Sequence, residues 1–227
     1  IEKALTSEEN KGLKFDDNYY YFVVNSSNIL DSHNDMHVDG NWKKTVKEQQ
    51  GKVYLVFDHT LKRREIIAMQ KDIEMLTAKI PFSLLGKNYD GESYCLIYKV
   101  AKDKIVNKEA KQWLEDGHKL EASVRMQYVK IRVAFKSTNP EYAKQNQVYE
   151  EYYDSIANKE EFSEEIIYFY VVDEAKNVYE SSLVLFGSNG ATGLIQENKT
   201  DADIITPEIK EEPLQDTQIV KRKLSVI

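Results

Sequence analysis

Apolar and β-branched residues gather in short runs that polar segments separate, and this pattern predicts a strand-rich chain. The runs that predict strands are 19–24, 52–59, 65–69, 74–82, 165–173 and 177–187. The run 94–100 fits either a strand or a helix, and the polar stretch 25–40 predicts a loop. Only residues 174–176 separate the last two runs, so we expect those runs to form a hairpin.

A long alternating stretch, 118–135, predicts a further strand. Leu120, Ala122 and Val124 lie on its apolar face, whereas Ser123 lies on its polar face. Three helices are predicted at 41–51, 107–117 and 139–159, each beginning at an asparagine cap: Asn41, Asn107 and Asn139. These helices alternate with strands, so the expected fold class is α+β.

Sequence character divides the chain of 227 residues into three parts. Residues 1–18 are polar and predict a flexible lead-in, 19–192 predict one folded domain, and 193–227 predict a disordered, acidic tail. The segment 197–216 has seven acidic and two basic side chains, so it carries five of the seven net negative charges. The folded part is therefore closer to neutral than the whole chain.

Composition excludes several classes of protein. The net charge of −7 disfavours a nucleic-acid partner, because such binding rests on phosphate contacts from Lys and Arg. A single cysteine, Cys95, excludes a disulfide framework and a cysteine-based zinc site, and its apolar surroundings predict a buried thiol. No run approaches the roughly 18 apolar residues of a membrane span, so we expect no membrane partner.

His59 and Ser123 are the candidate chemical pair. A serine hydroxyl needs an adjacent base to become a nucleophile, and the base needs a third group to orient it. Histidine suits the base role because its ordinary pKa of about 6.5 lies near neutrality. Alone, a serine on an alternating strand and a histidine at a strand end are more often solvent-facing than catalytic.

Two other segments offer weaker candidates. His33, Asp35, His37 and Asp39 alternate in one loop and are ligand types for divalent metals, but Asp and Asn in loops more often cap turns. We therefore expect neither a metal nor an organic cofactor. The glycine-rich segment 187–193 lacks the lysine and the following helix of a phosphate-binding loop.

Four ordered blocks resemble the prohead (capsid maturation) serine protease family of tailed bacteriophages. They are SHNDMHVDGNWKKTV (32–46), VYLVFDHT (53–60), WLEDGHKLEASVRMQY (113–128) and VYESSLVLFGSNGATG (178–193). The resemblance covers about residues 19–192. Each block alone is unspecific, whereas their order is more specific. Against the family pattern, Glu121 stands where small residues are usual, and 136–163 looks like a helical insertion.

This resemblance implies an assemblin-like fold, a mostly antiparallel β-barrel surrounded by a few helices. It implies Ser123 as nucleophile, His59 as general base and Glu180 as the third catalytic residue, with Asp58 and Asp173 as alternatives. The oxyanion hole stays open between backbone N–H groups and a side chain such as Arg125.

The function implied is a phage or prophage endopeptidase in the host cytoplasm, inside the assembling prohead. Its substrates would be scaffold protein, major capsid protein and the protease itself, as a possible homo-oligomer. The tail is either plain disorder, or a self-cleavage site or tether to scaffold. The alternative is a non-catalytic scaffolding or capsid-interaction protein that retains the fold. A β-rich binding module with no link to phages is the third possibility.

Overall fold

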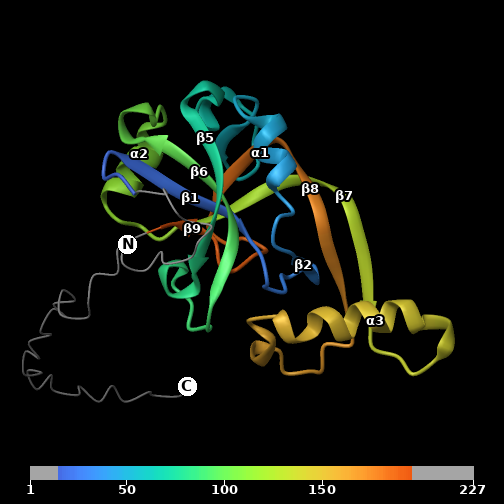
Figure 1. The fold of residues 1–227 in the computed structure, drawn as a ribbon. Helices are drawn as coiled ribbons and strands as arrows, with labels where there is room; N and C mark the ends of the chain where they lie inside the picture. Colours follow the sequence, from blue (N-terminus) through green and yellow to red (C-terminus); the bar gives the residue numbers. More distant parts are fainter. Residues whose placement is uncertain (1–14, 196–227) are drawn as a thin grey trace, which may run out of the picture. The chain divides into compact units, whose positions relative to one another are not determined.

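The computed structural model describes residues 15–195, and they form an α+β fold (Figure 1). The strands are β1 Tyr19–Ser26, β2 Asp35–His37, β3 Tyr54–Phe57, β4 Ile66–Ala68, β5 Ile73–Pro81, β6 Glu92–Ala101, β7 Glu121–Phe135, β8 Tyr168–Val184 and β9 Gly193–Leu194. The α-helices are α1 Lys43–Gln49, α2 Lys108–Glu115 and α3 Ala143–Tyr152. Residues 1–14 and 196–227, which include most of the predicted lead-in and tail, lie outside the described residues.

The strands form two sheets. One has the order β5-β6-β1-β9 and is antiparallel throughout. In the other, β8 pairs with β2 and β3 in parallel and with β7 in antiparallel fashion, and β4 follows β3. Within the described residues these sheets do not close into one barrel, so the expected barrel is not found.

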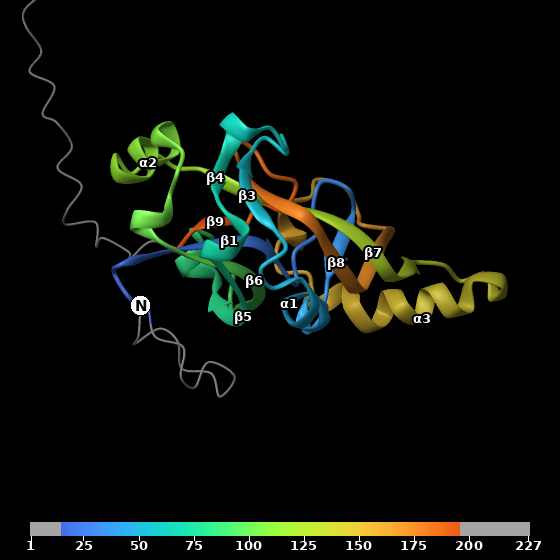
Figure 2. The ribbon, with the colours of Figure 1, turned by 90° about the horizontal axis from the view of Figure 1, so that it is seen from above.

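The predicted hairpin between 165–173 and 177–187 is wrong. Most of both runs belongs to the single 17-residue strand β8, which pairs with β7 from Tyr168 to Val184 (Figures 1 and 2). Residues 174–176 stay extended because each pairs with a residue of β7, and Ala175 is buried. The segment also lacks the Gly, Asn or Asp residues that tight hairpin turns favour.

Two other expectations fail in detail. The loop expected over 25–40 contains β2, whose residues are buried against β8. Asn41 does not cap α1, because its side chain instead bonds the ring of His37. Asn107 does cap α2, where its side chain accepts from the backbone N–H groups of Glu109 and Ala110.

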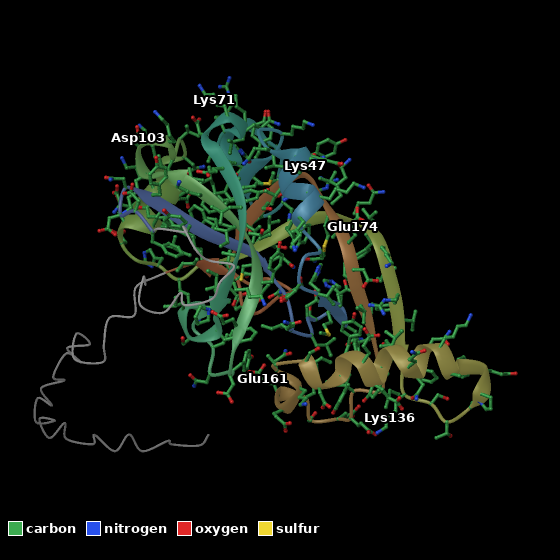
Figure 3. All side chains as sticks on the ribbon, viewed as in Figure 1. Lys47, Lys71, Asp103, Lys136, Glu161 and Glu174 are labelled. Atoms are coloured by element: carbon green, nitrogen blue, oxygen red, sulfur yellow. The ribbon has the colours of Figure 1, made fainter. Side chains whose placement is uncertain are left out.

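The main core lies between the two sheets. Phe22, Leu96 and Tyr98 of the first sheet and Leu55 and Leu183 of the second belong to one buried cluster. A separate cluster joins α3 to the C-terminal end of β7 and the N-terminal half of β8. Figure 3 shows the labelled Lys136 beside this helix, whereas Glu174 lies nearer α1. The C-terminal half of β8 therefore packs in the main core, and this half carries the candidate site.

The C-terminal part of the described chain returns to the first sheet. β9 pairs with β1, and the backbone N–H of Ile195 bonds to the carbonyl of Tyr21. Residues 193–195, which the sequence assigned to the tail, thus take part in the fold. In residues 15–195 no helix has the length and hydropathy needed to cross a membrane.

Candidate functional site

A strained turn presents His59. Asp58 and His59 both have positive φ, +47° and +52°, and the backbone N–H of Thr60 bonds to the carbonyl of Phe57 at 2.9 Å. This is the pattern of a type I′ turn, and a turn whose central residues are not glycine adopts it at some energetic cost. His59 therefore lies in a turn after β3, and the alternation of side chains along a strand does not apply to it.

A bulge in β8 places Glu180. Val124 pairs with Ser181 and Met126 with Asn177, so residues 178–180 stand opposite Arg125 alone. Tyr179 takes up the distortion with φ of +69°, and its ring is 62% exposed. Glu180, the next residue, is fully buried. The extra residues turn Tyr179 outward and leave the Glu180 carboxylate inside the fold.

Backbone strain is concentrated at this place. The five non-glycine residues with positive φ among the described residues are Asn28, Asn34, Asp58, His59 and Tyr179. Asparagine tolerates this conformation well, whereas tyrosine and histidine do so less readily. All the described residues with this strain other than asparagine flank or form the candidate site. Such strain persists where the surrounding structure imposes it, which is common at functional sites.

Three side chains form a connected hydrogen-bond set. The Nδ1 atom of His59 lies 2.9 Å from Oε1 of Glu180, and Ser182 Oγ donates to Oε2 of the same carboxylate at 2.8 Å. Ser182 Oγ also accepts from the backbone N–H of His59 at 2.7 Å. An ionised carboxylate only accepts, so a hydrogen bond to it requires the proton on Nδ1, and the neutral tautomer with that proton has a lone pair on Nε2. The His59 side chain is 39% exposed.

Ser123 lies on the face of the sheet that also carries Ser182 and Glu180. It stands directly opposite Ser182 in the β7–β8 ladder, and directly opposed residues have Cβ atoms about 4.5–5.5 Å apart on one face. Ser123 is half-buried. The described residues give no hydrogen bond between its hydroxyl and the His59 ring. Such contacts are often loose in an enzyme without substrate and tighten when substrate binds.

Glu121 has a partner of its own. Its carboxylate accepts from the backbone N–H of Gly187 at 2.6 Å. Nearby, Thr192 Oγ1 donates to the carbonyl of Ala122 and accepts from its N–H. A Cβ atom on Gly187 would lie 2.9 Å from the carbonyl oxygen of Ala122, so this close approach requires glycine. The glycine-rich segment 187–193 thus packs on the start of β7 and fixes the strand that carries Ser123.

The alternatives for the third residue lie elsewhere. Asp173 receives two hydrogen bonds from the Arg132 guanidinium, at 2.7 and 2.8 Å. It is seven residues before Glu180 on β8, in the half of the strand near α3. Asp58 shares the turn with His59, but the described contacts join the His59 ring to Glu180 only. The arrangement therefore unites Glu180 with His59 and separates Asp173 from both.

Arg125 remains beside the site. It is exposed, two residues after Ser123, and its guanidinium lies 5.9 Å from the centre of the Tyr179 ring. A cation at this place is available to a developing negative charge near Ser123.

The alternating His and Asp residues of the loop do not form a metal centre. His37 is fully buried and Asp35 is nearly so, whereas the His33 side chain is 72% exposed. Burial raises the pKa of Asp35, while its hydrogen bond from Tyr128 works against that shift. In residues 15–195 no group of three or more His, Cys, Asp or Glu side chains is placed to hold a metal ion.

Sequence reasoning missed the role of Ser182. The residue belonged to the fourth block, yet only the structure shows that it links the Glu180 carboxylate to the backbone of the His59 turn. The i, i+2 spacing of Glu180 and Ser182 on a strand was the available signal, because it places both on one face.

Comparisons with protein-family models, with curated proteins and with solved structures give no match for this chain.

Proposed function

We propose that this protein is a serine endopeptidase of the phage prohead maturation type, with Ser123, His59 and Glu180 as its catalytic set. The observation that carries the proposal is the contact of the partly exposed His59 ring with the fully buried Glu180 carboxylate, on the face that holds Ser123. Nucleophile, base and orienting acid are thereby supplied by three adjacent elements.

In this mechanism the roles of His59 and Glu180 rest on their hydrogen bond, and that of Ser123 rests on its position opposite Ser182. Ser123 Oγ attacks the carbonyl carbon of the scissile bond while Nε2 of His59 takes its proton. The leaving amine then receives that proton, and a water molecule activated by the same nitrogen hydrolyses the acyl-enzyme. Glu180 holds the proton of Nδ1 in place and stabilises the imidazolium. Arg125 or nearby backbone N–H groups would stabilise the oxyanion.

The finer assignments belong to the same proposal. The order of the four blocks supports an assemblin-like topology, although the sheets of the described residues stay open. Scaffold protein, major capsid protein and the protease itself are the proposed substrates, cleaved inside the assembling prohead in the host cytoplasm. As the third catalytic residue we propose Glu180 and not Asp58 or Asp173, because among these three the described contacts join only Glu180 to the His59 ring.

The decisive test is Ser123→Ala in the full chain. We expect it to abolish cleavage of scaffold protein and of the chain itself, with an unchanged melting temperature, when new termini are mapped by mass spectrometry. Ser137→Ala is the matched control, because Ser137 follows the other end of β7 and should leave cleavage intact. Undiminished cleavage by Ser123→Ala would refute the proposal.

One observation favours the non-catalytic alternative, a scaffolding or capsid-interaction protein with the same fold. Ser123 and His59 share a face, yet the described residues give no hydrogen bond between them. If the wild-type chain cleaves nothing while it binds scaffold or capsid protein, this alternative replaces the enzyme.

A further inference from the structure

The edge of β7 that faces away from β8 is a long, open strand edge. Among the described strands β7 pairs with β8 alone, and Figure 1 shows it on the outer side of that strand. The described residues give the backbone of 123–135 no hydrogen bonds besides those of the ladder with β8. The N–H and C=O groups along such an edge are free to pair with a further strand.

The other edges of the two sheets are closed or short. At the edge strand β5, the Gln50 side chain donates to the carbonyl of Met75 and accepts from its N–H, at 3.1 and 2.8 Å. Pro81 ends that strand, and the edge strands β2, β4 and β9 have three residues or fewer. Covering side chains, prolines and short strands all hinder the addition of a strand. Between 123 and 135, β7 has none of these three protections.

Exposed apolar side chains lie along the open edge. Ile131 and Val133 of β7 and Tyr168 and Tyr170 of β8 are between 36% and 45% exposed. Val133 stands directly opposite Tyr170, and Tyr168 follows on the same face, so the four form one patch. Apolar residues beside an unpaired strand edge mark a place where another chain can add a strand.

The last part of β7 has the regularity that strand addition needs. The shifts in its register with β8 lie between Val124 and Ile131, and the pairing is regular from Ile131 to Phe135. Ile131, Val133 and Phe135 therefore share one face, whereas Arg132 and Ala134 lie on the other. A strand that follows this edge meets apolar groups on one face and the basic side chain of Arg132 on the other.

Charge distinguishes this edge from the rest of the protein. Residues 122–136 have four basic side chains and no acidic one, in a chain whose net charge is −7. Arg132 and Lys136 already have close acidic partners. Arg125 has no ion-pair partner among the described residues, and Lys130 lies 3.9 Å from the carboxylate that Arg132 binds at 2.7 Å. These cations favour an acidic partner, whereas a second copy of β7 would bring like charges together.

We propose that the edge of β7 from Lys130 to Phe135 binds an extended acidic segment of another polypeptide as an additional strand. Main-chain hydrogen bonds hold the segment, its apolar side chains lie beside Ile131 and Val133, and its carboxylates face Lys130. The segment therefore alternates apolar and acidic residues.

This docking site is separate from the candidate catalytic set. Ile131 lies eight residues beyond Ser123, on the order of 25 Å along the strand. The inference therefore does not depend on the proposed endopeptidase function, and loss of cleavage in Ser123→Ala leaves it untouched.

The experiment measures binding of a fluorescent peptide of alternating glutamate and valine to the full-length protein by fluorescence anisotropy. Val133→Asp should weaken binding about tenfold, because it adds a like charge and removes an apolar contact. Val106→Asp is the matched control, since Val106 is 55% exposed and lies outside β7, and it should bind as the wild type does. If Val133→Asp lowers the melting temperature, Lys130→Glu takes its place, because the Lys130 side chain is 66% exposed.

Two further peptides test the chemistry of the partner. A peptide of the same composition with its valines and glutamates in separate blocks keeps the charge but loses the alternation. A peptide with lysine in place of glutamate keeps the alternation but reverses the charge. Both should bind about tenfold more weakly than the alternating acidic peptide.

Photo-crosslinking identifies the occupant of the edge. Benzoylphenylalanine in place of Val129, which is 49% exposed and flanks the docking site, should give an adduct with the acidic peptide. Adducts solely within the same chain, or solely with a second copy, would overturn the proposal. Absence of binding by the wild type, or equal affinity for the acidic, block and lysine peptides, would overturn it as well.

Discussion

Two histidines in this fold are each held at Nδ1, and their surroundings give them opposite chemistry. His59 meets the Glu180 carboxylate at 2.9 Å with its ring partly exposed. His37 meets the Asn41 side-chain amide at 2.8 Å, is fully buried, and stacks on Trp42 with ring centres 5.6 Å apart. Two residues of one type thus differ in the charge of their partner and in their access to solvent, and only His59 has the surroundings that the proposed role of a base requires.

Burial explains why His37 stays neutral. Loss of water around the ring lowers the pKa of His37 to about 3. An amide partner cannot offset this cost, because it brings no negative charge to stabilise an imidazolium. The partner of His59 is instead the side chain of an acid, Glu180. His37 therefore lies in the fold as a neutral ring, whereas proton transfer is proposed for His59 alone.

The largest expected effect separates the two histidines. His59→Gln should reduce kcat/KM for peptide cleavage by about 10⁴-fold, the upper range for loss of a general base, and leave the melting temperature unchanged. His37→Phe should keep kcat/KM within about twofold but lower the free energy of unfolding by about 1–3 kcal/mol, because the Asn41 amide loses its acceptor. Steady-state kinetics and urea unfolding of both variants measure this, and the reverse pattern would contradict the comparison.

The next effect concerns two carboxylates of β8. Glu180→Gln should reduce kcat by about 10³-fold, since the amide leaves His59 without a charged partner and can favour the wrong tautomer. Asp173→Asn is the matched control, because Asp173 is paired with Arg132 and should affect stability only. Kinetic constants of Asp58→Asn belong in the same series. A greater loss in Asp173→Asn or Asp58→Asn would reassign the third residue.

Acid should weaken the fold through His37. The pKa of His37 is about 3 in the folded protein and 6.5 in the unfolded chain, so between these values the unfolded state binds more protons. Stability is thus greatest above pH 6.5 and falls as the pH drops toward 3, at up to about 1.4 kcal/mol per pH unit from this group. Urea unfolding at several pH values should show a shallower decline in His37→Phe, and an unchanged slope would refute this role.

The smallest effect concerns Ser182, which we treat as a positioning residue. Ser182→Ala removes one hydrogen bond to Glu180 and one acceptor for the His59 backbone, and should lower kcat about tenfold with KM unchanged. Ser182→Thr retains the hydroxyl and should restore most of kcat. An equal loss of kcat in both variants would show that kcat depends on the packing of residue 182 and not on its hydroxyl.

Local signals predicted much of the fold. Asn107 and the stop at Gly117 predicted α2 because a cap acts within a few residues, and the burial of Cys95 followed from its apolar run. Burial raises the pKa of that thiol to about 12, so it is unreactive. The continuity of β8 and the short strand β2 depend on pairing with distant residues, and local sequence does not encode such pairing.

The geometry of the candidate site also depends on pairing between distant residues. Ordered blocks singled out His59, Ser123 and Glu180, and the structure brings the three to one face. The positive φ of His59 and Tyr179 and the double contact of Ser182 depend on how β3, β7 and β8 meet. Such features arise from tertiary structure, and a strand assignment for His59 could not reveal them.

The most direct test of the catalytic set is covalent labelling with a fluorophosphonate, which reacts with activated serines. The wild-type protein should give one adduct, located on Ser123 by peptide mass spectrometry, at a rate that His59→Gln reduces at least a hundredfold. Absence of any adduct on Ser123 of the folded wild-type protein, or equal labelling in His59→Gln, would contradict the proposal that His59 and Glu180 activate this serine.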